Sequence, residues 1–270
     1  TMMRVPAAFN AVRWTTRSQT LRHCPRMLGT ASQAVISQLA PSGVLRAGIN
    51  MRNPLLVTGK TESGDPDGVA PDMAREIAKR LGVEVKLVPY SSPGDLADAA
   101  EKGEWEVALV AAEPARAKVI NFTSAYCEIE ATYLVPEGSP LATIADVDKK
   151  GVRVAAVARG AYQLWLSENL QHAKVVMGEG HDATFDVFVD QKLDALAGLR
   201  DKLGKEAKKL PGSKVLEGKF TSVLQSIGVP KGKEACVPFL QDLVTDVKAN
   251  GFVEESIKRH SVVGKLSVAL

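Results

Sequence analysis

Apolar and polar positions alternate along the chain from Val44 onward, with a period that switches regularly between two and about 3.6 residues. Residues 83–88 (VEVKLV) have the period of a strand, and residues 72–81 repeat apolar side chains at helical spacing. Pro71 at the expected start of this helix and Gly82 just past its end are typical helix boundaries. Strands and helices follow each other in turn, which predicts a parallel sheet covered by helices.

The same alternation occurs twice. The first set predicts strands at 45–49, 83–88 and 105–110 and helices at 72–81 and 93–102. The second set predicts strands at 152–157, 174–177 and 193–197 and helices at 161–170, 183–191 and 202–208, with further helices at 234–249 and 253–259. Extended segments at 131–136 and 223–230 separate the sets, so we expect an α/β protein of two lobes, with the chain crossing out and back.

This organisation predicts four parts of the chain. They are an N-terminal extension over 1–43, a first lobe over 44–132, a second lobe over 133–224, and a return to the first lobe with C-terminal helices over 225–270. We expect a hinge at about 131–135 and 223–228. Two strands that cross together allow closure by small dihedral changes.

Composition fits an ordinary globular protein, with 45% hydrophobic and 24% charged residues among 270. The net charge of +3 is unevenly distributed: residues 1–61 hold eight Lys or Arg and no acid, which leaves 26 basic against 31 acidic residues in the remainder. A body with that acidic excess does not favour nucleic-acid binding, which needs a clustered basic face. No apolar run is long enough for a transmembrane segment.

The N-terminal extension is rich in Arg, Ser and Thr. It lacks the apolar core of a secretory signal. Its composition suits an organellar transit peptide, which would be mitochondrial in a eukaryote, or a flexible segment without a targeting signal. Both interpretations stay open. Residues 31–40 predict a short helix at its end.

Metal and cofactor sites have no support in the spacing of ligand residues. Cys24, Cys127 and Cys236 are scattered, which favours free thiols over a Cys127–Cys236 bridge. The four histidines form no metal-binding pair. Residues 178–183 match G-x-G-x-x-A, but Glu179 and Asp182 would repel a pyrophosphate. We therefore expect neither a metal nor a cofactor.

Several stretches resemble a known family. LRAGIN, GVAPDMAREIAKRLGVEVKLVPY, GEWEVALVAAEPARAKVINFTSAY and LDALAG occur in this order over residues 44–252. Together they are similar to the bacterial family 3 extracellular solute-binding proteins. The resemblance implies the two-lobed type II periplasmic-binding fold with a two-strand hinge, a small carboxylate-bearing ligand and an ABC transporter permease as partner. It also implies a periplasmic or extracellular location, which the N-terminus does not support.

Arg116 is the first candidate for ligand binding. It follows the apolar run 107–110 and Pro114, at what we expect to be the start of a helix. The resemblance implies that this arginine projects into the cleft between the lobes and binds the ligand carboxylate. Its planar guanidinium offers paired donors that match the two carboxylate oxygens.

Other first-lobe candidates follow the ends of predicted strands. Asn50 and Asn53 come after the first strand, where relatives contact the ligand, although loop asparagines also form turns without any ligand. Tyr90 and Ser91 follow the next strand.

Second-lobe candidates are Arg159, Gly160, Ala161 and Tyr162, which come before a predicted helix. The unpaired N–H groups of a helix start suit an anion.

The chain departs from the family where an amino-acid ligand is usually recognised. Ala111 and Glu113 stand about the turn where relatives usually carry a Ser or Thr, and Leu199 and Arg200 stand where many carry an aspartate for the ligand ammonium. Either Glu113 binds the ammonium instead, or the ligand has none and Arg200 adds positive charge to the cleft.

Three functional classes follow from these residues. The first is a solute-binding protein without catalytic activity. The second is an enzyme similar to the cyclohexadienyl dehydratases of the same fold, with Glu113 as general acid or base. The third is an interaction subunit that has lost ligand binding.

Overall fold

The structure, a computed structural model, describes residues 31–270. The predictions for residues 1–30, Cys24 included, lie outside the described residues. The first described element is helix α1 (Gln33–Leu39), where the side chain of Ser32 accepts a hydrogen bond from the backbone N–H of Val35 at 3.3 Å. This cap confirms the short helix expected at 31–40.

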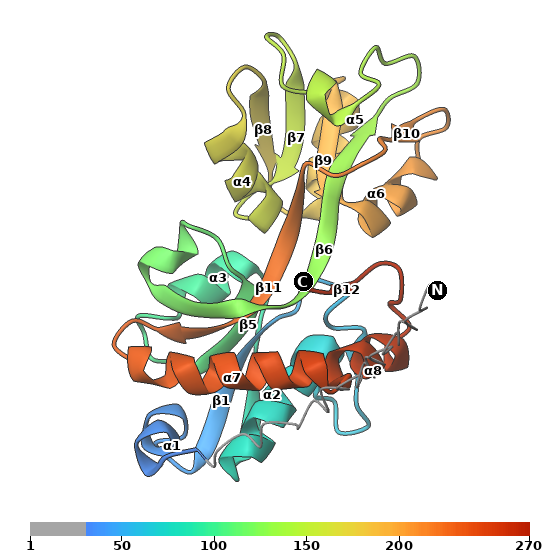
Figure 1. Ribbon diagram of the computed structural model, residues 1–270. Coiled ribbons are helices and arrows are strands. Elements are labelled where there is room, and N and C mark those ends of the chain that lie inside the picture. Colours follow the sequence, from blue (N-terminus) through green and yellow to red (C-terminus); the bar gives the residue numbers. More distant parts are fainter. Residues whose placement is uncertain (1–30) are drawn as a thin grey trace, which may run out of the picture.

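The first lobe contains three parallel strands with helices packed on them (Figure 1). Its strands lie in the order β4 (Glu84–Tyr90), β1 (Val44–Asn50), β5 (Val107–Ala111), and its helices are α2 (Val69–Leu81) and α3 (Pro93–Asp98). A short ribbon of β2 (Gly59–Lys60) and β3 (Pro66–Asp67) lies beside them. Helix α2 buries Met73 and Ile77 in the core and ends at Gly82, whose φ of 70° is a left-handed conformation that glycine adopts without strain.

The second lobe repeats this arrangement. Its parallel strands lie in the order β9 (Ala195–Leu199), β7 (Arg153–Val157), β8 (Lys174–Gly178), with helices α4 (Ala161–Asn169), α5 (His181–Asp190) and α6 (Arg200–Ala207). A short strand β10 (Lys214–Val215) and the turn η2 (Ile144–Asp146) complete it.

Two long strands run between the lobes, β6 (Ile120–Val135) and β11 (Thr221–Pro230) (Figure 1). They are antiparallel to each other; β11 also pairs with β5 of the first lobe, and β6 with β9 of the second. The sheets of the two lobes are therefore connected through β6 and β11 in one continuous series of hydrogen-bonded strands. The position of a hinge within them stays a prediction.

The C-terminal segment lies on the first lobe. It contains the turn η3 (Glu234–Cys236), helices α7 (Val237–Ala249) and α8 (Phe252–Arg259), and strand β12 (Ser267–Val268), which pairs with β6. Arg80 of α2 contacts Asp246 of α7 at 2.8 Å. Cys127 and Cys236 are both buried free thiols. Within residues 31–270 no helix is both long and apolar enough to cross a membrane.

Two local predictions need correction. A helix does begin at Arg116, but it is the single 3-10 turn η1 (Arg116–Lys118) and not an α-helix, and β6 starts at Ile120. Residues from Ile120 onward instead pair with β11, and this long-range pairing overrides the local helical signal. Helix α3 also ends at Asp98, earlier than expected.

Candidate functional site

A cavity of about 290 Å³ lies between the lobes. First-lobe residues reach it from the loop after β1 and from the turn after β5, and second-lobe residues reach it from the starts of α4, α5 and α6. The candidates that line it are Asn50, Asn53, Arg116, Gly160, Ala161 and Tyr162. The other predicted residues, Tyr90, Ser91, Glu113, Arg159 and Arg200, are not among its lining residues.

Arg116 is almost completely buried, with 4% of its surface exposed. Its Nη1 donates to the carbonyl oxygen of Ala111 at 2.9 Å, and its Nη2 donates to the carbonyl oxygen of Arg159 at 3.1 Å. A guanidinium has five N–H donors, so these two bonds leave donors for a ligand in the cavity. Burial lowers the pKa of Arg116 to about 10, and the guanidinium is therefore still charged at neutral pH.

Glu113 lies close to Arg116 in the sequence and in space but forms no ion pair with it within 4.0 Å. Burial raises the pKa of Glu113 to about 7, and the nearby positive charge of Arg116 opposes this rise. Near neutral pH the side chain is thus divided between its protonated and charged forms.

Arg159 connects the two lobes. Besides the bond from Arg116 to its carbonyl oxygen, its guanidinium lies 2.7 Å from Asp98 and 4.0 Å from Asp95, both in α3 of the first lobe. Its backbone has a φ of 59°, which is uncommon for a residue with a side chain. The side chain and the carbonyl oxygen of Arg159 both contact the first lobe, so the two lobes touch each other in this structure.

Asn50, Asn53, Tyr90 and Ser91 all have hydrogen bonds within the protein. The side-chain oxygen of Asn50 accepts from the N–H of Arg52 at 3.1 Å, and that of Asn53 accepts from the N–H of Leu55 at 3.0 Å, as in asparagine turns. Tyr90 donates to Glu104, and Ser91 to Asp95. Only the two asparagines line the cavity.

Gly160, Ala161 and Tyr162 bring the start of α4 to the cavity. Gly160 is the cap residue, and it has no side chain that could occupy the helix start. The first N–H groups of a helix have no acceptor within the helix and can bind an anion.

Several lining residues were missed by the sequence analysis. They are charged or polar, and they include Arg52, His181, Lys202, Lys205, Asp201 and Gln225. The cavity therefore has four cationic side chains, including Arg116, and one carboxylate, Asp201. The only local signal was the position of Arg52 between the two candidate asparagines.

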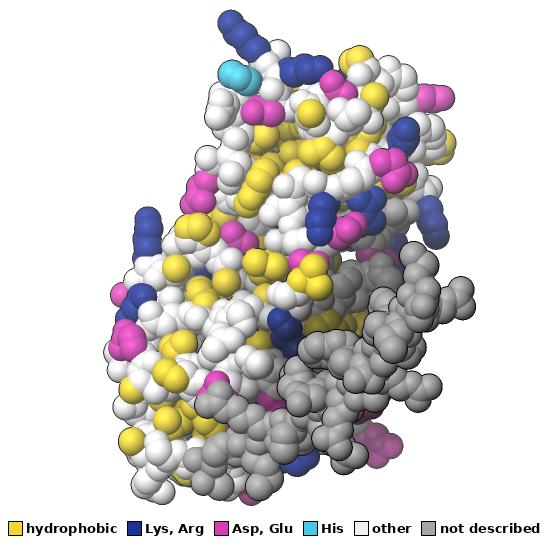
Figure 2. Space-filling model, viewed as in Figure 1, with side chains coloured by type: hydrophobic (Ala, Val, Ile, Leu, Met, Phe, Trp, Pro, Cys, Tyr) yellow, Lys and Arg dark blue, Asp and Glu magenta, His cyan; other side chains and the backbone are white. Residues whose placement is uncertain are grey.

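The ion pairs of α6 neutralise part of this charge. Asp201 contacts Lys205 at 2.8 Å and Lys265 at 3.3 Å, and Lys202 contacts Glu206. On the face of the molecule where α6 lies, Lys and Arg side chains accordingly lie next to Asp and Glu (Figure 2).

Arg200 points away from the main cavity. It contacts Glu130 at 2.8 Å and donates to the carbonyl oxygens of Leu216 and Gly218. It borders a separate polar cavity near Gly264.

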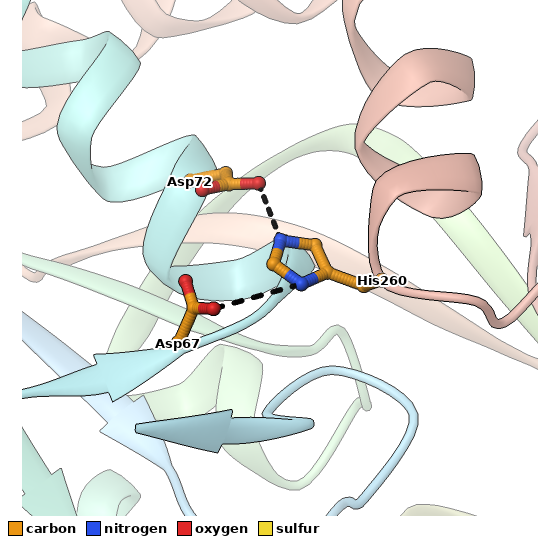
Figure 3. Close-up of side chains that lie close together, drawn as sticks. All are labelled: Asp67, Asp72 and His260. Carbon is orange, nitrogen blue, oxygen red and sulfur yellow. Dashed lines mark hydrogen bonds and ion pairs between the residues drawn. The ribbon is translucent and has the colours of Figure 1, made fainter. Parts of the chain in front are cut away.

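A second polar cluster ties the C-terminal segment to α2. Figure 3 shows His260 between Asp67 and Asp72, at 3.9 and 2.7 Å. These three side chains could meet at a metal ion. However, Asp72 already accepts hydrogen bonds from Ser256 and Arg259 at 2.6 Å each, which leaves little room for a cation.

Comparison with known proteins identifies a family. The sequence profile of the bacterial extracellular solute-binding proteins, family 3, matches residues 45–262. The L-cystine-binding protein TcyJ of Escherichia coli K12 is 23% identical over 228 residues, which cover 83% of this chain and 85% of that protein. The cyclohexadienyl dehydratase of Pseudomonas aeruginosa is 26% identical over 188 residues, which cover 64% of this chain and 67% of the enzyme.

Solved structures agree on the fold. The solute receptor for L-cysteine of Neisseria gonorrhoeae superposes with a TM-score of 0.68 at 19% identity, covering 87% of this chain and 99% of that one. At this identity the likeness supports the two-lobed type II fold and says nothing of the ligand.

Proposed function

This chain belongs to the bacterial extracellular solute-binding proteins, family 3, and we propose that it captures a small carboxylate-bearing metabolite in the cavity between its lobes. The main observation behind the proposal is Arg116, a buried guanidinium that lines this cavity and has N–H donors not used in hydrogen bonds to the protein. Glu113 lies near Arg116 but forms no ion pair with it and is partly protonated near neutral pH, so a ligand carboxylate would supply a full counter-ion for the buried charge.

The other residues receive roles in this proposal. The ligand carboxylate lies between Arg116 and the first N–H groups of α4, beginning at Ala161, since the N–H of Gly160 already donates to the carbonyl oxygen of Val157 at 3.2 Å. Asn50 and Asn53 offer their remaining amide N–H donors. Tyr162 contributes the surface of its ring.

Closure of the two lobes is the second element of the proposal. The lobes rotate about β6 and β11, near 131–135 and 223–228, and the contacts of Arg159 hold them together when a ligand is bound. TcyJ and the L-cysteine receptor are named as binding proteins, and an ABC transporter permease is the partner we propose for delivery.

A ligand screen tests the proposal. The full chain is mixed with amino acids, keto acids, dicarboxylates and aromatic acids in a thermal-shift assay, and positive compounds are measured by calorimetry. A ligand that binds only the folded state raises the unfolding temperature. We expect at least one carboxylate to bind and amines without a carboxylate to have no effect. If no carboxylate binds, the proposal is wrong and the interaction-subunit alternative is favoured.

A dehydratase is the second candidate, and Glu113 is the observation in its favour. A carboxyl group with a pKa of about 7 is suited to general acid catalysis at neutral pH. Glu113 does not line the cavity, however, so binding without turnover is the preferred function. Turnover of prephenate by the full chain, and its loss in Glu113→Gln, would establish the enzyme.

A further inference from the structure

Arg52 and Arg116 differ from every other arginine among residues 31–270. Neither lies within 4.0 Å of a carboxylate. The remaining arginines of the described chain each form an ion pair: Arg46, Arg75, Arg80, Arg153, Arg159, Arg200 and Arg259. Both exceptions line the same cavity. Among residues 31–270, the arginines that form no ion pair within 4.0 Å are thus confined to the cavity.

The two guanidinium groups come from separate places in the first lobe. Arg116 lies in the turn after β5, and Arg52 lies in the loop after β1, where the N–H of Arg52 is fixed by the side chain of Asn50 at 3.1 Å. The backbone N–H of the preceding Met51 donates to the backbone carbonyl oxygen of Tyr90 at 2.9 Å, which connects this loop to β4. The Arg52 side chain therefore projects from an anchored backbone, and no hydrogen bond within the described chain holds its guanidinium.

Charges near Arg52 form a second positive region of the cavity. His181 at the start of α5 is half-buried, and its pKa is lowered by desolvation and by the positive charges of Lys202 and Arg52. All three of these side chains line the cavity. The charges that act on the pKa of Arg116 are instead those of Glu113, which raises it, and Arg159, which lowers it. The cavity thus has two positive regions, one at Arg116 and one at Arg52.

One further polar side chain lines the cavity. Gln225 of β11 is 3% exposed, and its amide offers one acceptor oxygen and two N–H donors. The guanidinium groups of Arg116 and Arg52 add donors to the same cavity. The lining can therefore bind several anionic or polar oxygens.

We propose that the ligand is a small dicarboxylate whose two carboxylates bind Arg116 and Arg52. This inference rests on the proposed function and adds the second charged group. The charge of Asp95 acts on Arg52 without forming an ion pair within 4.0 Å, whereas a second ligand carboxylate would supply bidentate acceptors for this guanidinium. His181, neutral at physiological pH, offers a ring N–H to the same group.

Calorimetry with matched ligands tests this. Succinate, glutarate and adipate are each compared with the monocarboxylate of the same carbon number, butyrate, pentanoate and hexanoate, using the full chain. We expect at least one dicarboxylate to bind at least tenfold more tightly than its matched monocarboxylate. Arg52→Gln should weaken dicarboxylate binding much more than monocarboxylate binding and so remove this advantage, while Arg52→Lys should restore part of it.

Arg153→Gln is the matched control, because it removes the same charge from an ion pair with Asp194 that is not part of the cavity. It should preserve the dicarboxylate preference, and thermal unfolding should show that all variants are folded. Equal affinity for a dicarboxylate and its monocarboxylate, or an Arg52→Gln variant that keeps the preference, would overturn the inference alone. Absence of binding in both series would also overturn it, and the broader screen then decides whether the proposed function falls as well.

Discussion

Arg116 of the first lobe donates a hydrogen bond across the cleft to the backbone carbonyl oxygen of Arg159 in the second lobe, at 3.1 Å. The guanidinium of Arg159 extends back to the first lobe and contacts Asp98 at 2.7 Å. These two contacts bring the residue proposed to bind the ligand into direct contact with a residue that joins the lobes. We therefore expect ligand binding at Arg116 to be coupled to closure of the lobes.

Gly94→Ala should weaken ligand binding without unfolding the protein. A Cβ atom at Gly94 would lie 2.6 Å from the guanidinium of Arg159 and would displace it from α3. The Arg159–Asp98 pair is about half exposed, so its loss costs less than about 1 kcal/mol, or at most a fivefold change in affinity. Calorimetry measures the change. Gly204→Ala in α6, where a Cβ atom has no neighbour within 4 Å, is the matched control; equal affinities in the two variants would rule out a role for this contact.

Glu113 should make the protein less stable as the pH rises from about 4.5 to 7. Its pKa rises from 4.5 to about 7 on folding, so in this window the folded state holds a proton that the unfolded state has lost, and the unfolding free energy falls with increasing pH. We expect the unfolding free energy of the wild type to fall by about 2 kcal/mol across this window. Glu113→Gln carries no charge, so this fall should be absent in the variant. Urea unfolding at pH 5 and 8 measures it, with the exposed Glu101→Gln as control. A wild-type slope that survives in Glu113→Gln would refute the assignment.

Asp72→Asn should detach the C-terminal segment from α2. Burial favours a raised pKa for Asp72, but hydrogen bonds from Ser256, Arg259 and His260 lower it below its usual value. The stabilisation is therefore present above pH 3.8 and is lost as the pH falls through the folded-state pKa. We expect a loss of about 2 kcal/mol in unfolding free energy at pH 7. The exposed Asp242→Asn in α7 should have no effect, and equal losses in both variants would count against the cluster.

An ammonium group on the ligand should weaken binding. Among residues 31–270 the one carboxylate that lines the cavity is Asp201, which already contacts Lys205 and Lys265, so an ammonium would have to displace a lysine. We expect glutarate to bind at least tenfold more tightly than L-glutamate in calorimetry. Tighter binding of L-glutamate that is abolished by Asp201→Asn or by Glu113→Gln would contradict this expectation and identify the acceptor of the ammonium.

The sequence was sufficient for the fold and for one half of the site. The strand that ends before Pro114 and the helix that starts after Gly160 are both short-range patterns, so Arg116, Gly160 and Ala161 could be assigned to strand and helix ends without the structure. Their placement at the cleft came from the family resemblance, which implies that the arginine after this strand binds the ligand carboxylate.

The rest of the site depends on side-chain directions and on contacts between lobes. Arg52 and His181 are far apart in the sequence and come from different lobes, and only the packing of the two lobes against each other brings them to one cavity. Arg200 and Asp201 are neighbours at the start of α6, yet the first side chain leaves the cavity and the second lines it. Helical geometry separates adjacent side chains by about 100°, so an uncertainty of one residue in the helix start reverses such an assignment.

Titration of the tightest ligand from the carboxylate screen into wild type, Arg116→Lys and Arg116→Ala tests the central claim most directly. We expect a loss of affinity of at least tenfold in Arg116→Lys, which keeps the charge but lacks the paired donors, and at least 100-fold in Arg116→Ala. Thermal unfolding of each variant without ligand shows whether it is folded. Undiminished binding by folded Arg116→Ala would contradict the assignment of this cavity as the ligand site.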